Sequence, residues 1–146
     1  MNKYKLQLVQ DEEVEYNVNV IKNADDMTKL MIDGIELHKE PEEVLIMIAL
    51  NIKKNIIGCF EVSRGTVNSS AVHPREVFKR AILSNAAGIV LAHNHPSGSI
   101  NPSKNDREVT TRMKEAGKIL GIELIDHLII GEDDYFSFVE NTGIIN

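Results

Sequence analysis

An apolar stretch in the middle of the chain, VLIMIALNI over residues 44–52, most constrains the fold. Turn-like residues KKN follow at 53–55, and a second apolar stretch, IIGCFEV, covers residues 56–62. Apolar runs of this length bounded by turns are typical of buried strands. The sequence therefore predicts an antiparallel hairpin of two buried strands, with Glu61 as an acidic residue near the end of the second.

Strands and helices are predicted in alternation along the rest of the chain. Apolar and polar residues alternate over residues 4–8 and 14–20, which predicts two half-buried strands at the start of the chain. Helical spacing of apolar residues predicts a helix from Asn23 to about Glu36 and one from Pro74 that stops near residues 85–88. A third helix carries Val109, Met113, Ala116 and Leu120 before Gly121 ends it. Further strands are expected over residues 88–93, 122–130 and 135–138. We expect the α/β or α+β class, with a mixed β-sheet flanked by helices.

The length and composition of the chain limit the classes of protein to which it can belong. The 146 residues are 42% hydrophobic and 26% charged, which suits one globular domain over residues 1–146. The single cysteine, Cys59, excludes an intramolecular disulfide and a Cys-rich zinc site, and we expect it to be buried. No apolar stretch reaches the length of a membrane span and the first residues lack a signal core. We expect a cytoplasmic protein that does not enter membranes.

The net charge of −6 gives no general surface for nucleic acid, which needs clustered Lys and Arg. Two predicted helices nevertheless concentrate positive charge, and acidic residues interrupt the cluster. We favour a solvated helix face and leave direct nucleic-acid binding as the less favoured alternative. The basic residues concerned are Arg75, Lys79, Arg80, Lys104, Arg107, Arg112 and Lys114.

Two histidines mark the end of the strand predicted at residues 88–93. His93 and His95 are two residues apart, so a strand places both rings on one face and Asn94 on the other. Asp106 follows in the first turn of the next helix and could fold back against them. Two imidazoles and a carboxylate suit a Zn²⁺ site with one open position, although Fe²⁺ or Mn²⁺ would accept the same ligands.

A purely structural interpretation of the same segment is available. Ser103 and Asp106 have the spacing of a helix capping box, and Pro-Ser-Gly is typical of a turn. A capped helix does not explain His93 and His95, because burying a histidine in a strand costs free energy unless its ring nitrogens have hydrogen-bond partners. From the residues alone, the metal site and the capped turn both remain open.

The segment HNHPSGSINPSKND resembles the JAMM signature of MPN-type metallopeptidases: His-x-His, seven residues, Ser, two residues, Asp. The flanking stretches NAAGIVLAHNHPSG, VHPREVFKRAI and GIELIDHLIIG resemble the bacterial RadC-type branch, and the resemblance covers residues 22 to 140 or so. It implies an MPN/JAB-type fold, an architecture broadly similar to that of cytidine deaminases. Deaminase chemistry itself is excluded, because it needs a Cys pair and His-x-Glu.

The resemblance also implies roles for individual residues. His93, His95 and Asp106 would bind one Zn²⁺ per chain, and Ser103 would donate a hydrogen bond to the developing oxyanion. The family uses a glutamate on an upstream strand to activate water, and Glu61 is our best candidate. The alternative for Glu61 is a strand-end acid paired with Arg64 or Arg75.

These roles predict a zinc-dependent hydrolase of peptide or isopeptide amide bonds, with a peptide or protein as substrate. The alternative is a DNA-repair-associated accessory or binding protein with a retained metal site, because the RadC-type family carries that label. Larger members place a helix-hairpin-helix segment before this domain, and we expect this sequence to lack it.

The remaining polar residues are interpreted as structural. We expect His127 to pack in the core and hydrogen-bond Asp126 or a backbone group rather than to bind metal. Asp126 or a backbone carbonyl could orient a ligand histidine from outside. His73 is expected to precede a helix, and His38 to be exposed.

Overall fold

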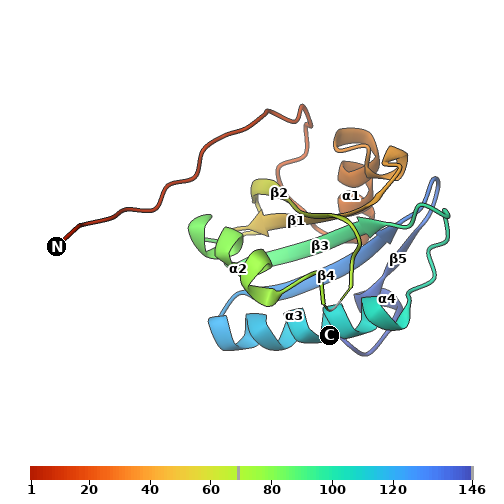
Figure 1. Ribbon diagram of the computed structural model, residues 1–146. Helices are drawn as coiled ribbons and strands as arrows, with labels where there is room; N and C mark the ends of the chain where they lie inside the picture. The colour runs from red at the N-terminus through yellow and green to blue at the C-terminus, as the bar shows by residue number, and fades with distance from the viewer. Residues whose placement is uncertain (69, 146) are drawn as a thin grey trace.

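The computed structural model describes residues 1–68 and 70–145, and these form a five-stranded sheet with helices on both faces (Figure 1). The strands are β1 (Glu43–Leu50), β2 (Ile56–Gly65), β3 (Gly88–Asn94), β4 (Glu123–Ile130) and β5 (Tyr135–Ser137). The helices are α1 (Ala24–Lys29), α2 (Pro74–Leu83), α3 (Lys104–Leu120) and α4 (Phe138–Asn141), with a π-helical turn η1 (Leu30–Gly34) and a 3-10 turn η2 (Leu37–Lys39).

The strand order β2-β1-β3-β4-β5 combines both kinds of pairing. β1 is antiparallel to β2 and to β3, β3 is parallel to β4, and β4 is antiparallel to β5. Parallel neighbours need a long crossover, and α3 supplies it between β3 and β4. The loop between β3 and α3 therefore leaves the carboxyl end of a central strand. The mixed sheet and α+β class are as expected.

Alternate residues of the central strands face two separate cores. Leu45 and Met47 point toward the core covered by α2 and α3, together with Leu91 of β3. Ile46 and Ile48 point toward the core covered by α1. Figure 1 shows α1 on one side of the sheet and α3 on the other. A strand buried on both faces explains why residues 44–50 are apolar almost without interruption.

The central elements agree with the sequence. The predicted hairpin is β1 and β2, and α2 begins at Pro74 as the sequence indicates. Gly121 ends α3 with φ +70°, a left-handed conformation that favours glycine. The helix predicted from the cap Asn23 is regular only to Lys29 and then widens into the π-helical turn.

The prediction of two strands at the start of the chain is wrong. Residues 1–19 have no strand pairing, and Val20 forms only an isolated bridge with Asn55. Tyr4 and Leu6 are 82% and 80% exposed, because alternation makes a strand only where a sheet edge accepts the backbone. At the other end of the chain, the strand predicted to residue 138 stops at Ser137, whose side chain caps α4.

Cys59 is exposed, which corrects the expectation of a buried residue. It lies on β2, an edge strand whose residues alternate between contact with the core and exposure. Over the described ranges 1–68 and 70–145, no helix has both the length and the apolar content needed to cross a membrane.

Candidate metal centre

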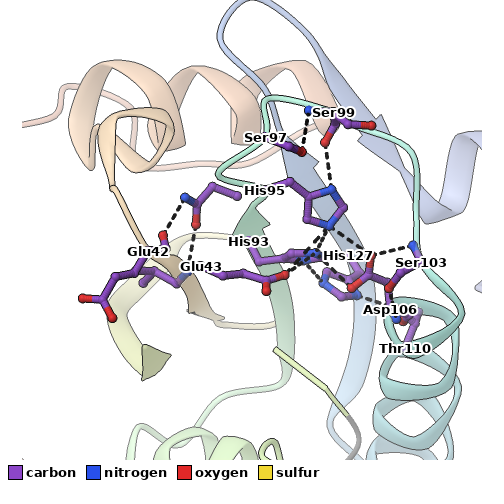
Figure 2. Close-up of polar contacts among 12 residues, drawn as sticks. Glu42, Glu43, His93, His95, Ser97, Ser99, Ser103, Asp106, Thr110 and His127 are labelled. Atoms are coloured by element: carbon purple, nitrogen blue, oxygen red, sulfur yellow. Dashed lines mark hydrogen bonds and ion pairs between the residues drawn. The ribbon is translucent and has the colours of Figure 1, made fainter. Parts of the chain in front are cut away.

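Four side chains converge at the carboxyl end of β3, on the face covered by α3 (Figure 2). His93 comes from β3, His95 from the residue after the strand, Asp106 from the first turn of α3, and Glu43 from the first residue of β1. One ligand atom from each lies within 4.8 Å of the others. The sequence-predicted residues His93, His95 and Asp106 are thus brought together, and Glu43 joins them.

The two histidines and the aspartate are in close contact. His93 Nε2 lies 3.1 Å from His95 Nε2 and 3.2 Å from Asp106 Oδ1. His95 Nε2 lies 3.1 Å from Asp106 Oδ2. Glu43 Oε1 stands further out, 3.9 Å from the Nε2 atoms of both histidines.

Burial differs across the cluster. The side chains of His93 and Asp106 are 0% and 1% exposed, whereas those of His95 and Glu43 are 16% and 22% exposed. The cluster therefore opens to solvent on the side of His95 and Glu43. Beside His95, a cleft of about 400 Å³ lies between the segment from His95 to Gly98 and the turn from Ile130 to Asp134.

A capping box holds Asp106 in place. Asp106 Oδ2 accepts a hydrogen bond from the backbone N–H of Ser103 at 2.8 Å, and Ser103 Oγ accepts one from the Asp106 N–H at 3.0 Å. The capped helix and the donor cluster, which the sequence offered as alternatives, are both present. The same carboxylate serves both: Oδ2 accepts from the Ser103 N–H and also contacts His95, and Oδ1 contacts His93.

The loop after β3 fixes the ring of His95. Its Nδ1 lies 2.8 Å from the backbone carbonyl oxygen of Ser99. A carbonyl can only accept, so Nδ1 carries the proton and Nε2 of the neutral ring presents a lone pair to the cluster. The turn that makes this contact is closed by the Gly98 N–H, which donates to His95 O at 2.8 Å. Gly98 has φ +78°, which a residue with a Cβ adopts only at a cost.

The surroundings shift the pKa values of these groups. Burial raises the pKa of Asp106, but its contacts with the His93 and His95 rings outweigh this effect and hold that pKa far below its ordinary value. The hydrogen bond that the protonated His95 ring donates to Asp106 through Nε2 raises the pKa of His95. A buried carboxylate that stays ionised beside two imidazoles is suited to a cation.

The sequence matches the RadC-like JAB domain over residues 21–144, most of the chain. The chain belongs to this family. It is a JAB-type domain with a buried cluster of two histidines, an aspartate and a glutamate that could hold a metal ion.

Relatives of this RadC-like JAB domain include several UPF0758 proteins. The protein from Clostridium perfringens is 48% identical over 120 residues, which cover 82% of this chain and 52% of the relative. The Clostridioides difficile protein is 49% identical over 121 residues, 83% of this chain and 51% of the relative. The Rubrobacter xylanophilus protein is 56% identical over 99 residues, 68% of this chain and 43% of the relative. The chain spans about half the length of the curated relatives it matches.

The structure does not bring Glu61 to the cluster, and Glu43 stands there instead. Cross-strand partners share a face of a sheet. Leu45 pairs with His93, so Glu43, two residues before Leu45, lies on the His93 face. Glu61 pairs with Ile46, which faces the opposite side of the sheet. Its carboxylate forms an ion pair with Arg64, which was the alternative interpretation of this residue.

Glu43 could have been found in the sequence. It is also an acid at the end of an apolar strand, directly before the run that begins at Val44. The family pattern of a glutamate on an upstream strand fits Glu43 and Glu61 equally well. Only the pairing of β1 with β3 separates the two.

His127 is not one of the four donors, but its ring contacts one of them. Its Nε2 lies 2.8 Å from His93 Nδ1, and its Nδ1 lies 2.6 Å from Thr110 Oγ1. Asp126 accepts from the backbone N–H of His127 at 2.7 Å, and both ring nitrogens contact other residues. Burial, and secondly the neighbouring His93, lower the pKa of His127 well below its ordinary value. Thr110 gave no signal in the sequence.

Other polar residues of the segment have structural contacts. The Asn94 side chain accepts from the Val44 N–H at 2.8 Å and donates to the Glu42 carbonyl at 2.8 Å, which ties β3 to the start of β1. Ser97 accepts from the Ser99 N–H at 3.3 Å within the loop. His73 directly precedes α2, as expected.

His38 differs from its prediction and is partly buried, on the wall of the cleft beside His95. The basic residues of α2 form ion pairs with Glu76, at 2.6 Å for Lys79, 3.3 Å for Arg80 and 4.0 Å for Arg75. Such pairs are typical of a solvated helix face.

Proposed function

We propose that this RadC-like JAB domain is a zinc-dependent hydrolase that cleaves peptide or isopeptide amide bonds. The observation that carries the proposal is the convergence of His93, His95 and Asp106 with Glu43 beside them on the open side. Three protein ligands and one accessible position are typical of a catalytic zinc site rather than a structural one.

The spacing of the donor atoms suits zinc. Tetrahedral bonds of about 2.0–2.2 Å place neighbouring ligand atoms about 3.3–3.6 Å apart. The two histidine Nε2 atoms are 3.1 Å apart, and each lies 3.1 to 3.2 Å from one oxygen of Asp106, slightly closer than around a bound zinc ion. Glu43 Oε1, at 3.9 Å from both histidines, lies outside this spacing. We therefore assign the first three residues as ligands and Glu43 as a proton carrier.

A bound zinc ion would polarise the substrate carbonyl and lower the pKa of a water molecule toward about 7. Glu43 would accept a proton from the attacking water at Oε1 and deliver it to the leaving nitrogen. Ser103 Oγ already accepts from the Asp106 N–H, so its hydroxyl proton remains free to donate to the tetrahedral oxyanion.

An edge strand offers a way to hold an extended substrate. β2 is at the end of the sheet, and its residue Gly65 pairs with Glu43. A peptide added alongside β2 would hydrogen-bond through its backbone and lead toward the cluster, a common way of binding extended chains. The proposed partner is accordingly a peptide or protein rather than DNA.

The test compares Glu43→Gln with the matched control Glu61→Gln. Zinc-loaded wild-type protein is incubated with peptide mixtures and lysine-linked isopeptides, and cleavage is followed by mass spectrometry. Glu43→Gln should keep its zinc and lose at least about 100-fold in cleavage rate, because a general base contributes 10²–10⁴-fold. Glu61→Gln should keep both its zinc and the wild-type cleavage rate. A fully active, zinc-loaded Glu43→Gln protein would remove Glu43 from the mechanism, and an inactive wild type would reject the hydrolase.

A further inference from the structure

A chain of three buried groups lies behind His93, on the side away from the cluster (Figure 2). His93 Nδ1 contacts His127 Nε2 at 2.8 Å, and His127 Nδ1 contacts Thr110 Oγ1 at 2.6 Å. Thr110 Oγ1 in turn lies 2.7 Å from the backbone carbonyl of Asp106. His93, His127 and Thr110 are all 0% exposed, so water does not replace any of these partners.

The direction of the hydrogen bonds follows from counting protons. The Asp106 carbonyl can only accept, so the one hydroxyl proton of Thr110 points to it. Thr110 Oγ1 must then accept from His127 Nδ1–H. A neutral imidazole carries one proton, so His127 Nε2 has a lone pair and accepts from His93 Nδ1–H.

The position of the His93 proton determines whether Nε2 faces the cluster with a lone pair or with an N–H. With the proton on Nδ1, Nε2 of His93 presents a lone pair toward His95 and Asp106. If Thr110 instead donated to His127, the Asp106 carbonyl would lose its donor, the two bonds to the His127 ring would reverse, and an N–H at His93 Nε2 would occupy the place of a metal ion. The carbonyl one helical turn before Thr110 therefore controls a ring on a different element.

We propose that Thr110, acting through His127, is a positioning residue that sets the tautomer of His93 and keeps its Nε2 lone pair directed at the metal site. This inference rests on the proposed function for its use of a metal. One turn of α3 then supplies both the ligand Asp106 and the residue that prepares His93, because the Asp106 carbonyl anchors the Thr110 hydroxyl. Partners behind a ligand histidine commonly tune its binding in this way.

The first test needs no substitution. Long-range ¹H–¹⁵N spectra of metal-free, ¹⁵N-histidine-labelled protein distinguish the two neutral tautomers, with His93 assigned by its absence in His93→Asn. We expect His93 in the Nδ1–H form. The Nε2–H form in the wild-type protein would overturn the inference whether or not the protein binds zinc.

The second test compares Thr110→Val with Thr111→Val. The Thr111 hydroxyl also donates to the carbonyl four residues earlier, at 2.9 Å, but it is exposed. Both variants lose such a bond, and only Thr110→Val loses the contact with His127. We expect Thr110→Val to populate the Nε2–H form of His93 and to weaken zinc binding about 10–100-fold in competition with a chromophoric chelator. Thr110→Ser should restore both properties, and Thr111→Val should match the wild type.

Equal zinc affinity for Thr110→Val and wild type, with His93 unchanged, would contradict the inference. Failure of the proposed function has a different signature: the tautomer and affinity pattern would hold, and zinc-loaded wild type would cleave no amide.

Discussion

Asp106 has two roles that the sequence presented as alternatives. Its carboxylate closes the capping box of α3 and also faces His93 and His95. A cap fixes the side chain to the start of a rigid helix, so the position of the carboxylate does not depend on a metal ion. The capping residues thus contribute to the order of the candidate site as well as to the stability of the helix.

Ser103 allows the cap and the proposed chemistry to be separated. Ser103→Ala should lower the free energy of unfolding by about 1 kcal/mol, because the Asp106 N–H loses its acceptor. The Ser103 backbone N–H still holds Asp106, so zinc content should stay the same. If the hydroxyl also stabilises the oxyanion, kcat should fall about 100-fold.

The control is Asn23→Ala, at the cap of α1, where Asn23 Oδ1 accepts from the Asp26 N–H at 2.8 Å. Urea unfolding should show a similar loss for both variants, and only Ser103→Ala should change kcat. An unchanged kcat in Ser103→Ala would limit Ser103 to capping.

Local spacing determines which site residues can be predicted. His93, His95 and Asp106 lie within fourteen positions on a strand, a loop and a helix start, so their meeting follows from periodicity and the family signature. Glu43 depends on the pairing of Leu45 with His93, two residues far apart in the sequence. Thr110 depends on the packing of α3 against β4, which no single-residue pattern reveals.

At the scale of elements, Asp126 joins β4 to the β5–α4 corner. It accepts from Ser137 Oγ at 2.6 Å, from the Val139 N–H at 3.1 Å and from the His127 N–H at 2.7 Å. Burial raises the pKa of this carboxyl even though these hydrogen bonds oppose the shift. The folded chain therefore holds its proton more tightly than the unfolded chain, where the pKa of Asp is about 3.9.

The sign of this shift predicts a pH effect. The contribution of Asp126 to the free energy of unfolding should fall as the pH rises through the window above about 3.9, because the folded state holds the Asp126 proton more tightly there. Asp126→Asn does not titrate and can keep the contacts through its amide. At pH 7 its free energy of unfolding should be within about 1 kcal/mol of the wild-type value. As the pH falls toward 4, the wild type should become more stable relative to this variant. Asp126→Ala should lower the free energy of unfolding by more than about 2 kcal/mol, because three donors, two of them buried, lose their acceptor.

Urea unfolding of the metal-free proteins at pH 7 and pH 4.5 checks both statements. A wild type that loses stability relative to Asp126→Asn at the lower pH would show that burial does not dominate at this carboxyl.

Elements with strong patterns and buried faces were predicted, and those that depend on a partner were not. The apolar runs of β1 and β3 and the amphipathic α2 and α3 have patterns that tertiary packing reinforces. The alternation over residues 4–8 has no sheet edge to pair with, so it stays extended and exposed. The helix from Asn23 widens after Lys29, a change that periodicity over so short a segment does not reveal.

For the whole molecule, the sheet brings together donors that are far apart in the sequence, from Glu43 to Asp106. β1, β3 and α3 each contribute donors, and β4 contributes His127 behind them. The cluster lies at one end of the sheet, partly open to solvent through His95 and Glu43. A rigid sheet and a capped helix hold the donors close enough that a cation needs little rearrangement to bind.

Bound metal is the most direct measure of the central claim that this cluster is a zinc site. Untagged wild-type protein and His95→Ala would be purified without chelator, given zinc, freed of excess and compared by elemental analysis. We predict about one zinc per chain in the wild type and none in His95→Ala, because loss of one of three ligands removes most of the affinity. A wild type without metal, or a His95→Ala protein that keeps it, would contradict the account.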